Sequence, residues 1–344
     1  MKIRGLGPLR RVSQRLRNKF VNKGLVLMYH RVAALPSDPH LLCVSPQHFT
    51  EQLEILAKAY VPTSLQQLRQ ALCNEQIIDR SVVVTFDDGY VDNLYNAKPQ
   101  LERFEVPATV FVASSHIGKD RESWEDELER VLLQPGTLPP ALSLTINGTV
   151  HHWELETATN YDETDFARYS HWNVETKEAP TSRHTLYRVL YQLLRSVTKE
   201  EREQAVEEIR TWARIHSPAR STHRFLSSEE VLRLAEGSCI EVGAHSVTHT
   251  PLCSLSITKQ QAEIEESKIS LEQILGRPVT SFAYPYGQYT PETMTIMQKA
   301  GFSLACSTVE EVVWRGSNCF CLPRVCVRNW DGEEFVRQLR KWFK

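Results

Sequence analysis

The chain has 344 residues, of which 41% are hydrophobic and 24% are charged, a composition typical of a globular protein with a sizeable core. Lys and Arg number 40 against 42 Asp and Glu, so the formal net charge at pH 7 is −2. A chain without a basic excess is not expected to have nucleic acid as its main partner. It has no run of about 18 apolar residues, so the sequence predicts no transmembrane helix.

Residues 1–23 contain eight Lys or Arg and no acidic residue. Within this basic segment Leu9, Val12, Leu16 and Phe20 recur at helical spacing, which predicts a cationic helix with one apolar stripe. Such a helix either packs on its own domain or contacts an anionic inner membrane surface. The apolar stretch that follows is too short for a signal-peptide core. We therefore expect a cytoplasmic protein, peripheral to the inner face of the membrane if the helix binds there.

Short β-branched runs alternate with helical patterns along most of the chain. The predicted strands cover residues 25–29, 81–86, 108–112, 240–244, 282–284, 302–306 and 325–328. Strands separated by helices are typical of a parallel sheet with crossover connections, so the expected fold class is α/β. Helix starts are marked by capping residues: a capping box at Thr258 with Gln261, another at Ser227 with Glu230, and Thr290 followed by Pro291. These units are what a βα barrel is built from.

Residues 118–225 interrupt this alternation with a Pro-rich loop, a polar stretch and two helical patterns. We expect a mostly helical insertion or lid here, between two barrel segments at residues 24–117 and 226–344. Four of the seven tryptophans lie in the insertion, and each is more readily explained as a core residue than as a flat surface for ligand stacking. They are Trp124, Trp153, Trp172 and Trp212.

The strongest chemical signal is a buried-strand pattern that ends in Asp87, Asp88 and Gly89. At the C-terminal end of a barrel strand, side chains project into the mouth of the barrel, where active sites lie. Two adjacent carboxylates there lose hydration and repel each other unless a cation or hydrogen-bond donors compensate. A bound metal, or a base beside a metal, is the economical explanation. The alternative is a simple turn, because Asp-Gly is also a common turn dipeptide.

A second strand pattern, at residues 240–244, runs into His245 and His249. If a helical turn follows the strand, the two imidazoles lie on one side and can bind one metal ion. With Asp88 they offer one carboxylate and two imidazoles, which leaves coordination positions open, as in catalytic metal sites. The expected cofactor is one divalent ion, with zinc as the first candidate, which would lower the pKa of water and polarise a carbonyl.

At these residues the chain resembles the polysaccharide deacetylase family, also called the NodB-homology family or carbohydrate esterase family 4. The resemblance covers residues 24–117 and 226–330, and it implies a distorted (β/α)7 TIM-like barrel. The family's first motif matches Thr-Phe-Asp-Asp-Gly-Tyr, which implies Asp87 as general base and Asp88 as metal ligand. Its second motif matches His-Ser-Val-Thr-His, which implies His245 and His249 as the other ligands.

The family's third motif, Arg-x-Pro-Tyr-Gly, corresponds to residues 283–287, where Ala283 stands in place of the arginine. In the family, the backbone N–H of the residue that matches Tyr286 helps to hold the oxyanion. The arginine normally steadies the catalytic base, so its absence puts that role in doubt. Arg324, just before the last predicted strand, is the candidate replacement.

The family's usual C-terminal Leu-x-Leu-His motif, the source of its general acid, is absent. An acid is still required, because an amine leaves poorly unless it is protonated. The pattern resembles the branch that includes poly-N-acetylglucosamine deacetylases of exopolysaccharide systems, where a histidine near the N-terminus takes this part. The matching residue is His30, whose alternative role is a core or capping histidine. We expect His40, His48 and His116 to be surface or loop residues.

The resemblance thus implies a metal-dependent hydrolase that removes N-acetyl groups from an amino-sugar-containing poly- or oligosaccharide. Two alternatives stay open. The same site could serve an amidohydrolase or deformylase acting on a lipid-linked sugar or a non-sugar amide, since fold alone does not set the substrate. The chain could also be a non-catalytic sugar-binding module. For an enzyme of exopolysaccharide synthesis, the basic residues 1–23 would have a membrane-bound glycosyltransferase as a further possible partner.

Overall fold

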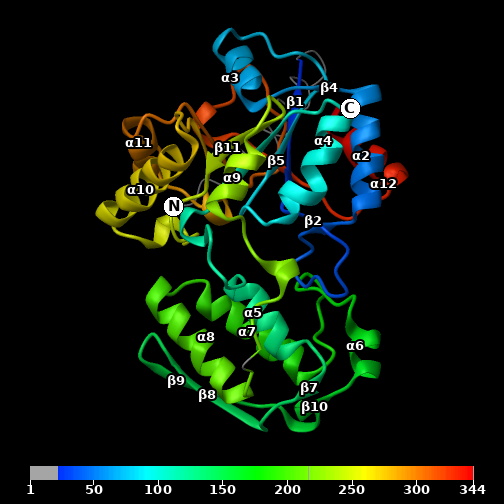
Figure 1. Ribbon diagram of the computed structural model, residues 1–344, viewed down its shortest axis with the longest axis vertical. Helices are drawn as coiled ribbons and strands as arrows, with labels where there is room; N and C mark the ends of the chain where they lie inside the picture. Colours follow the sequence, from blue (N-terminus) through cyan, green and yellow to red (C-terminus); the bar gives the residue numbers. More distant parts are fainter. Residues whose placement is uncertain (1–21, 216, 344) are drawn as a thin grey trace, which may run out of the picture.

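A computed structural model describes residues 22–215 and 217–343 of the chain. Seven parallel strands form the centre of its larger half, drawn at the top of Figure 1. In sheet order they are β13 (Leu304–Cys306), β12 (Ser281–Ala283), β11 (Ile240–Ala244), β6 (Ala108–Val112), β5 (Ser81–Phe86), β1 (Gly24–Tyr29) and β14 (Val325–Cys326). A short strand, β4 (Val61–Pro62), pairs with β5 off this path.

The two ends of this sheet are linked by the segment that precedes β14. Leu322 forms a parallel bridge with Cys306 of β13, and three residues later Val325 pairs with Leu27 of β1. The Leu322 N–H donates to the Ala305 carbonyl at 2.9 Å. The strands therefore form a distorted (β/α)7-type barrel, which confirms the predicted fold class.

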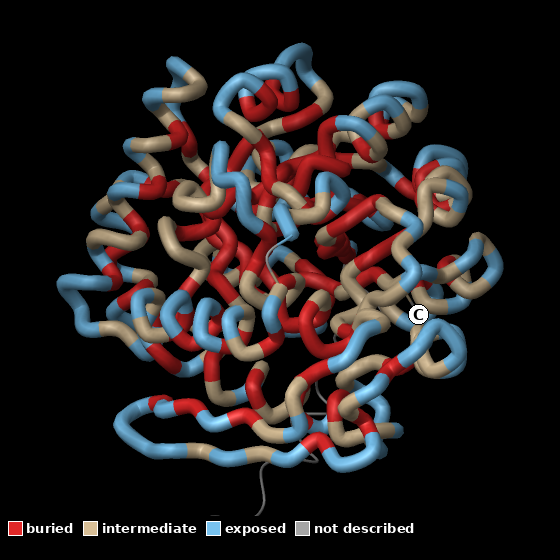
Figure 2. The backbone as a smooth tube through the Cα atoms, turned by 60° about the horizontal axis from the view of Figure 1, so that its bottom comes forward, coloured by how far each residue is buried: buried red, intermediate tan, exposed pale blue. Residues whose placement is uncertain are grey.

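Helices surround the strands and bury their apolar faces against them (Figure 1). They are α2 (Pro46–Ala59), α3 (Leu65–Cys73), α4 (Lys98–Arg103), α9 (Ser228–Leu234), α10 (Ile257–Leu275), α11 (Pro291–Lys299) and α12 (Gly332–Phe343). Figure 2 shows the result: buried segments fill the centre of the barrel, and exposed segments lie on the outer helices.

Local capping signals fix most helix starts as the sequence predicts. Ser227 with Glu230 forms a complete capping box at α9, and Thr290 caps α11 directly before Pro291. The predicted capping box at Thr258 is wrong, because α10 begins two residues earlier. Its N-cap is Ser256, whose side chain accepts a hydrogen bond from the Lys259 N–H. Ser256 therefore caps the helix, and Thr258 lies within its first turn.

Between β6 and β11 the chain builds a second lobe, drawn in green below the barrel in Figure 1. This lobe has a hydrophobic core of its own, to which Leu128, Leu142, Leu190 and Ile209 contribute fully or almost fully buried side chains. Its helices are α5 (Trp124–Leu132), α6 (Glu163–Tyr169), α7 (Ser182–Leu194) and α8 (Lys199–Ala213). Its strands are β7 (Gly136–Thr137), β8 (Ala141–Ile146), β9 (Thr149–Glu154) and β10 (Asn160–Tyr161).

The two ends of this second lobe are tied to each other by ion pairs. Glu122 lies before α5 and Arg220 lies after α8, and Arg220 Nη2 is 2.7 Å from Glu122 Oε2. The Arg220 backbone N–H also donates to Glu122 Oε1 at 2.7 Å, while Arg220 Nη1 is 2.7 Å from Glu129 Oε2. The Glu122 side chain is completely buried, so this cluster fixes the base of the lobe.

Near the barrel, β2 (Arg31–Val32) and β3 (Cys43–Val44) form a short parallel pair.

No helix in the described ranges, 22–215 and 217–343, is long and apolar enough to cross a membrane. The cationic helix predicted for residues 1–23 lies almost entirely outside those ranges. Its partners and the expected location of the protein stay predictions.

Candidate active site

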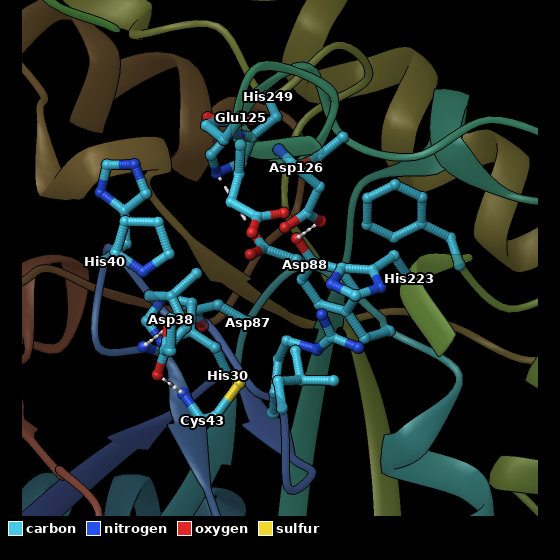
Figure 3. A pocket seen from close by; sticks show the side chains of 18 of the residues that line it. His30, Asp38, His40, Cys43, Asp87, Asp88, Glu125, Asp126, His223 and His249 are labelled. Carbon is cyan, nitrogen blue, oxygen red and sulfur yellow. Dashed lines mark hydrogen bonds and ion pairs between the residues drawn. The ribbon is translucent and has the colours of Figure 1, made fainter. Parts of the chain in front are cut away.

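The carboxyl ends of several barrel strands meet around one cavity of about 230 Å³ (Figure 3). His30 follows β1, Asp87 and Asp88 follow β5, and His245 follows β11. All four residues line this cavity, and so does His249. The sequence predicts this convergence because parallel strands present their carboxyl ends at one mouth of a barrel.

Three of these side chains form a group that can hold a metal ion. The candidate ligand atoms of Asp88, His245 and His249 all lie within 4.8 Å of one another. Asp88 Oδ1 is 3.3 Å from His249 Nε2 and 3.6 Å from His245 Nε2. No other such group of His, Cys, Asp or Glu occurs in the part of the chain that the structure describes.

The tautomer of His245 tests whether this group suits a metal. His245 Nδ1 lies 2.7 Å from the carbonyl oxygen of Ala283, and a carbonyl can only accept a hydrogen bond. Nδ1 therefore carries the proton, which leaves a lone pair on Nε2 facing Asp88. A backbone carbonyl that orients a ligating imidazole in this way is the usual outer-shell partner at metal sites. The donor set fits a divalent ion such as zinc.

Charge also favours a cation at this position. Burial, and then the neighbouring Asp87, raise the pKa of Asp88 well above its usual value. Burial, and then His245, lower the pKa of His249 well below its usual value. A buried carboxylate beside neutral imidazoles is compensated when all three groups bind one positive ion.

The loop that carries the two histidines differs from the sequence prediction. The sequence analysis makes the meeting of the two imidazoles conditional on a helical turn after Ala244, but residues 245–249 are not helical, and Ser246 and His249 have positive φ angles of 62° and 55°. Glu263 of α10 holds the loop in place, because its carboxylate accepts hydrogen bonds from the N–H groups of Val247 at 2.9 Å and Thr248 at 2.8 Å. The two imidazoles still meet, with ring centroids 4.8 Å apart.

Backbone conformations that L-residues rarely adopt gather around the cavity. Asp88, His249 and Tyr286 have φ angles of 74°, 55° and 55°. Each such residue costs about 1–3 kcal/mol and persists only where the surrounding structure enforces it. Their position at three separate loops of one cavity is typical of a functional site.

Asp87 is held by Arg324, as the sequence analysis anticipates for the missing motif arginine. Arg324 Nη1 and Nη2 lie 2.7 Å from Asp87 Oδ1 and Oδ2, and both side chains are buried. Burial alone would raise the pKa of Asp87, but Arg324 and then His245 outweigh it and lower this pKa to about 2. Asp87 is therefore an anion at neutral pH.

His30 lines the same cavity, and its pKa depends on burial and on the charges of neighbouring site residues. Burial lowers the pKa of His30 to about 4, against an opposing effect of the Asp87 charge. The imidazole is therefore neutral at pH 7. A role as general acid requires that His30 first gain a proton while substrate is bound.

Tyr286 lies in a short 3₁₀ turn, Pro285–Gly287, after β12. Its ring centroid is 4.7 Å from that of His249, and the guanidinium of Arg195 lies 4.3 Å from the centre of the same ring. The phenol donates to Glu125 Oε1 at 2.9 Å. The side chain is thus fully engaged, and the role expected for the backbone N–H of Tyr286 stays a proposal.

Two acids of the second lobe were missed by the sequence analysis. Glu125 and Asp126, in the first turn of α5, line the cavity (Figure 3). Burial raises the pKa of Glu125 to about 7 and that of Asp126 to about 6. Asp126 accepts a hydrogen bond from the phenol of Tyr90 at 2.9 Å. The N-cap pattern at Ser123 marks this helix start, but nothing local tells that its first turn faces the barrel.

His40 lies in a turn and His116 in the short 3₁₀ turn Ser114–His116, which agrees with the expectation of surface or loop positions. His40 and His116 both line the cavity, because the lobe folds back over their loops. His40 Nε2 is 2.8 Å from the phenol oxygen of Tyr187, and His116 stacks on Phe225 at 4.3 Å. His48 is on the surface as expected, with Nδ1 2.7 Å from an oxygen of the Asn329 side chain.

Comparison with known proteins agrees with the motifs. Residues 75–135 and 209–305 match the polysaccharide deacetylase family. The resemblance that the sequence motifs predict is therefore confirmed.

YxkH of Bacillus subtilis, which carries the name of a polysaccharide deacetylase, is 27% identical over 105 residues. That stretch is 30% of this chain and 38% of the length of YxkH.

Solved structures share the fold over nearly the whole chain. IcaB from Ammonifex degensii superposes with a TM-score of 0.58 and 19% identity, covering 94% of this chain and 97% of its own. The Streptococcus pyogenes deacetylase PplD, solved in complex with acetate, superposes with a TM-score of 0.57 and 18% identity. The match covers 92% of this chain and 98% of PplD. At such identities the likeness establishes the common fold.

Proposed function

We propose that the protein is a metal-dependent hydrolase that removes N-acetyl groups from an amino-sugar-containing poly- or oligosaccharide. One observation carries this proposal: the three candidate ligands Asp88, His245 and His249 lie beside a carboxylate, Asp87, that an arginine holds in a fixed orientation. The family match and the similarity to a deacetylase solved with acetate support the same reaction class.

A divalent ion held by the three ligands would supply Lewis acidity, both to activate water and to polarise the acetyl carbonyl. Asp87 is the proposed base. The low pKa of Asp87 makes its carboxylate a weak base, so the proposed catalysis depends on where the carboxylate is held. Arg324 fixes both carboxylate oxygens, and Oδ2 lies 4.0 Å from His245 Nε2. The backbone N–H of Tyr286 is the proposed oxyanion donor.

His30 is the proposed acid for the leaving amine. It follows β1, which pairs with β5 along its full length, and this places His30 at the same level of the barrel as Asp87. A neutral imidazole here is suited to take up the proton that the base removes and to pass it to the sugar nitrogen. The products would be acetate and a glucosamine-type sugar.

The second lobe, residues 118–225, is proposed to act as a lid on this site. It has a separate hydrophobic core, yet Glu125, Asp126, Tyr187 and Tyr191 from this lobe line the cavity. Such residues can exclude bulk water and contact the sugar rings on either side of the acetamido group.

The decisive experiment incubates the full chain, loaded with zinc, with N-acetylated glucosamine oligosaccharides. Mass spectrometry should show the loss of acetyl units, with a matching amount of acetate in solution. The Asp87→Asn variant is the matched control, because it keeps the size of the side chain and removes the base. Equal product from this variant and the parent would refute the assignment.

The alternatives give different outcomes in the same assay. A deformylase acting on a lipid-linked sugar would release formate from formylated substrates and leave acetyl groups in place. A sugar-binding module would bind the oligosaccharide, retain no tightly held ion after purification without chelator, and release nothing.

A further inference from the structure

A second cavity of about 220 Å³ adjoins the candidate active site. It lies between the loop that follows β6 and the first turns of α5 and α8. His116, Ser123 and Phe225 line both cavities, so the two are neighbours across a shared wall. Groups bound in the two cavities would therefore lie close to each other.

Arg202 of α8 lines this second cavity and is only 3% exposed. Its Nη1 atom has no hydrogen-bond partner and no exposed surface, and Nη2 makes one long contact of 3.5 Å to Thr250 Oγ1. The guanidinium also lies 5.5 Å from the ring centre of Trp124. No carboxylate within the described residues forms an ion pair with it. A buried guanidinium with unused donors is costly unless an anion completes it.

Three further polar atoms that belong to lining residues of this cavity have no hydrogen-bond partner. Ser115 Oγ and His116 Nδ1 are buried, and neither makes a hydrogen bond; Glu127 Oε2 is also buried without one, and Arg210 Nη1 lies 4.0 Å from it. In addition, the N-terminal turns of α5 (nine residues) and α8 (15 residues) line this cavity. Free N–H groups and the helix dipole make such ends favourable to negative charge.

Among the charged residues that line this cavity, two basic side chains have no acidic partner within residues 22–215 and 217–343. Each acid that lines it already has basic partners: Glu122 has Arg220 and Arg130, Glu127 has Arg121 and Arg210, and Glu203 has Lys199. Lys119 and Arg202 line the cavity without a carboxylate partner in the described part of the chain. Burial raises the pKa of Glu125, on the active-site side, and the charge of Arg202 acts in the opposite direction.

We infer that this cavity binds an anionic substituent of the glycan, a phosphate or a carboxylate, while the acetamido group of a neighbouring unit lies in the active site. Arg202 is the main anchor, Lys119 adds charge at the rim, and Ser115 offers a hydroxyl donor. The inference rests on the proposed function for its substrate class. It assigns a preference for charged over neutral N-acetylated glycans.

The test compares kcat/KM on three oligosaccharides of equal length: a neutral N-acetylglucosamine chain, one that alternates with glucuronic acid, and one with a single phosphomonoester. The variants are Arg202→Gln and the exposed Lys119→Gln, with Arg337→Gln on α12 and Lys58→Gln on α2 as controls that lie outside the lining of the cavity and do not pair with its acids. In parallel, calorimetry measures the binding of inorganic phosphate to each folded protein at constant ionic strength.

We expect kcat/KM to be more than about tenfold higher on one charged substrate than on the neutral one, since hydrogen bonds to charged groups are among the stronger ones. The charged substrate with the higher kcat/KM shows whether the subsite prefers a phosphate or a carboxylate. Arg202→Gln should reduce this ratio at least tenfold, Lys119→Gln should reduce it less, and the two controls should keep it.

A ratio that is the same in the parent, Arg202→Gln and Lys119→Gln would overturn the inference. If Arg202→Gln does not fold, Lys119→Gln decides. If no oligosaccharide is hydrolysed, the proposed function fails and the phosphate titration decides separately. If Arg202→Gln or Lys119→Gln weakens phosphate binding, the anion site is supported. If both variants bind phosphate as the parent does, Arg202 only packs against Trp124.

Discussion

Arg324 and Asp87 face each other across the barrel through two parallel hydrogen bonds of 2.7 Å. Two more donors of the guanidinium are also used, with Nε to the Ser307 carbonyl at 2.8 Å and Nη1 to Thr85 Oγ1 at 3.2 Å. The carboxylate of Asp87 therefore has one orientation. In the proposed function, Arg324 takes the part of the motif arginine that Ala283 replaces.

Arg324→Lys should lower kcat/KM for amide hydrolysis by about 10- to 100-fold, because a lysine cannot make a bidentate contact and leaves Asp87 free to rotate. Metal content should stay at the parental level. The control is Arg337→Lys on the exposed face of α12, which should have parental kinetics. Parental kcat/KM in Arg324→Lys, measured on folded protein, would show that Asp87 needs no orientation by Arg324.

The sequence predicts the part of the site that follows from strand ends. Asp87, Asp88 and His245 directly follow buried strands, and parallel strands bring their carboxyl ends together without any further information. Arg324 does not follow from this argument, because it precedes its strand, β14, and does not follow it.

The rest depends on contacts distant in sequence. Ser246 and His249 adopt positive φ, and nothing in their residue types indicates this, since the conformation is enforced by Glu263 on α10. Helix α5 is not among the helices that the sequence analysis predicts, and Glu125 reaches the cavity because the second lobe folds back over the barrel. Which face of a lobe meets its neighbour is a tertiary property that periodicity does not specify.

Removing a ligand should separate the roles of the two adjacent acids. Asp88→Ala, His245→Ala and His249→Ala should each lose bound metal and activity together, because two remaining ligands hold a divalent ion weakly. Asp87→Asn should keep the ion and lose turnover. Elemental analysis of the folded variants, read beside acetate release, checks this division. Metal loss in Asp87→Asn as large as that in Asp88→Ala would make Asp87 a ligand.

The ion pairs that tie the ends of the second lobe should matter for stability. Arg220→Met leaves the buried carboxylate of Glu122 with Arg130 alone, so the free energy of unfolding should fall by about 3 kcal/mol. Arg337→Met removes an ion pair whose arginine side chain is 70% exposed and should cost less than about 1 kcal/mol. Urea unfolding followed by tryptophan fluorescence measures both. Similar losses in the two variants would contradict the structural importance of the Glu122 cluster.

Glu230 should make part of the stability of the protein depend on pH. Its carboxylate accepts hydrogen bonds from Arg224 at 2.6 and 2.8 Å, and Arg224 lowers the pKa of Glu230 from 4.5 to about 2 against the opposing effect of burial. Because the folded pKa is the lower one, this stabilisation is complete above about pH 4.5 and is lost as the pH falls towards 2.

Glu230→Gln keeps the size of the side chain and removes its charge. The variant should be about 1–2 kcal/mol less stable than the parent at pH 7, and the difference should shrink as the pH falls below 4.5. Denaturation curves of both proteins between pH 7 and the lowest pH at which they stay folded measure it. A difference that does not change with pH would mean that the charge of Glu230 contributes nothing.

His30 is the residue whose proposed role is least supported by the strong motifs. If His30 protonates the leaving amine, His30→Ala should keep metal and fold while kcat on amide substrates falls by roughly 10²- to 10⁴-fold. The matched control is His48→Ala, which removes a surface histidine on α2 and should have no effect on kcat.

The kind of leaving group distinguishes an acid from a positioning residue. An activated aryl acetate releases a phenolate that needs little protonation, so its hydrolysis should suffer far less in His30→Ala than amide hydrolysis does. Equal losses on both substrates would mean that His30 orients the substrate or the base. Amide hydrolysis at the parental rate would remove His30 from the reaction, and His116 and His40 would then be the next candidates, because both line the same cavity.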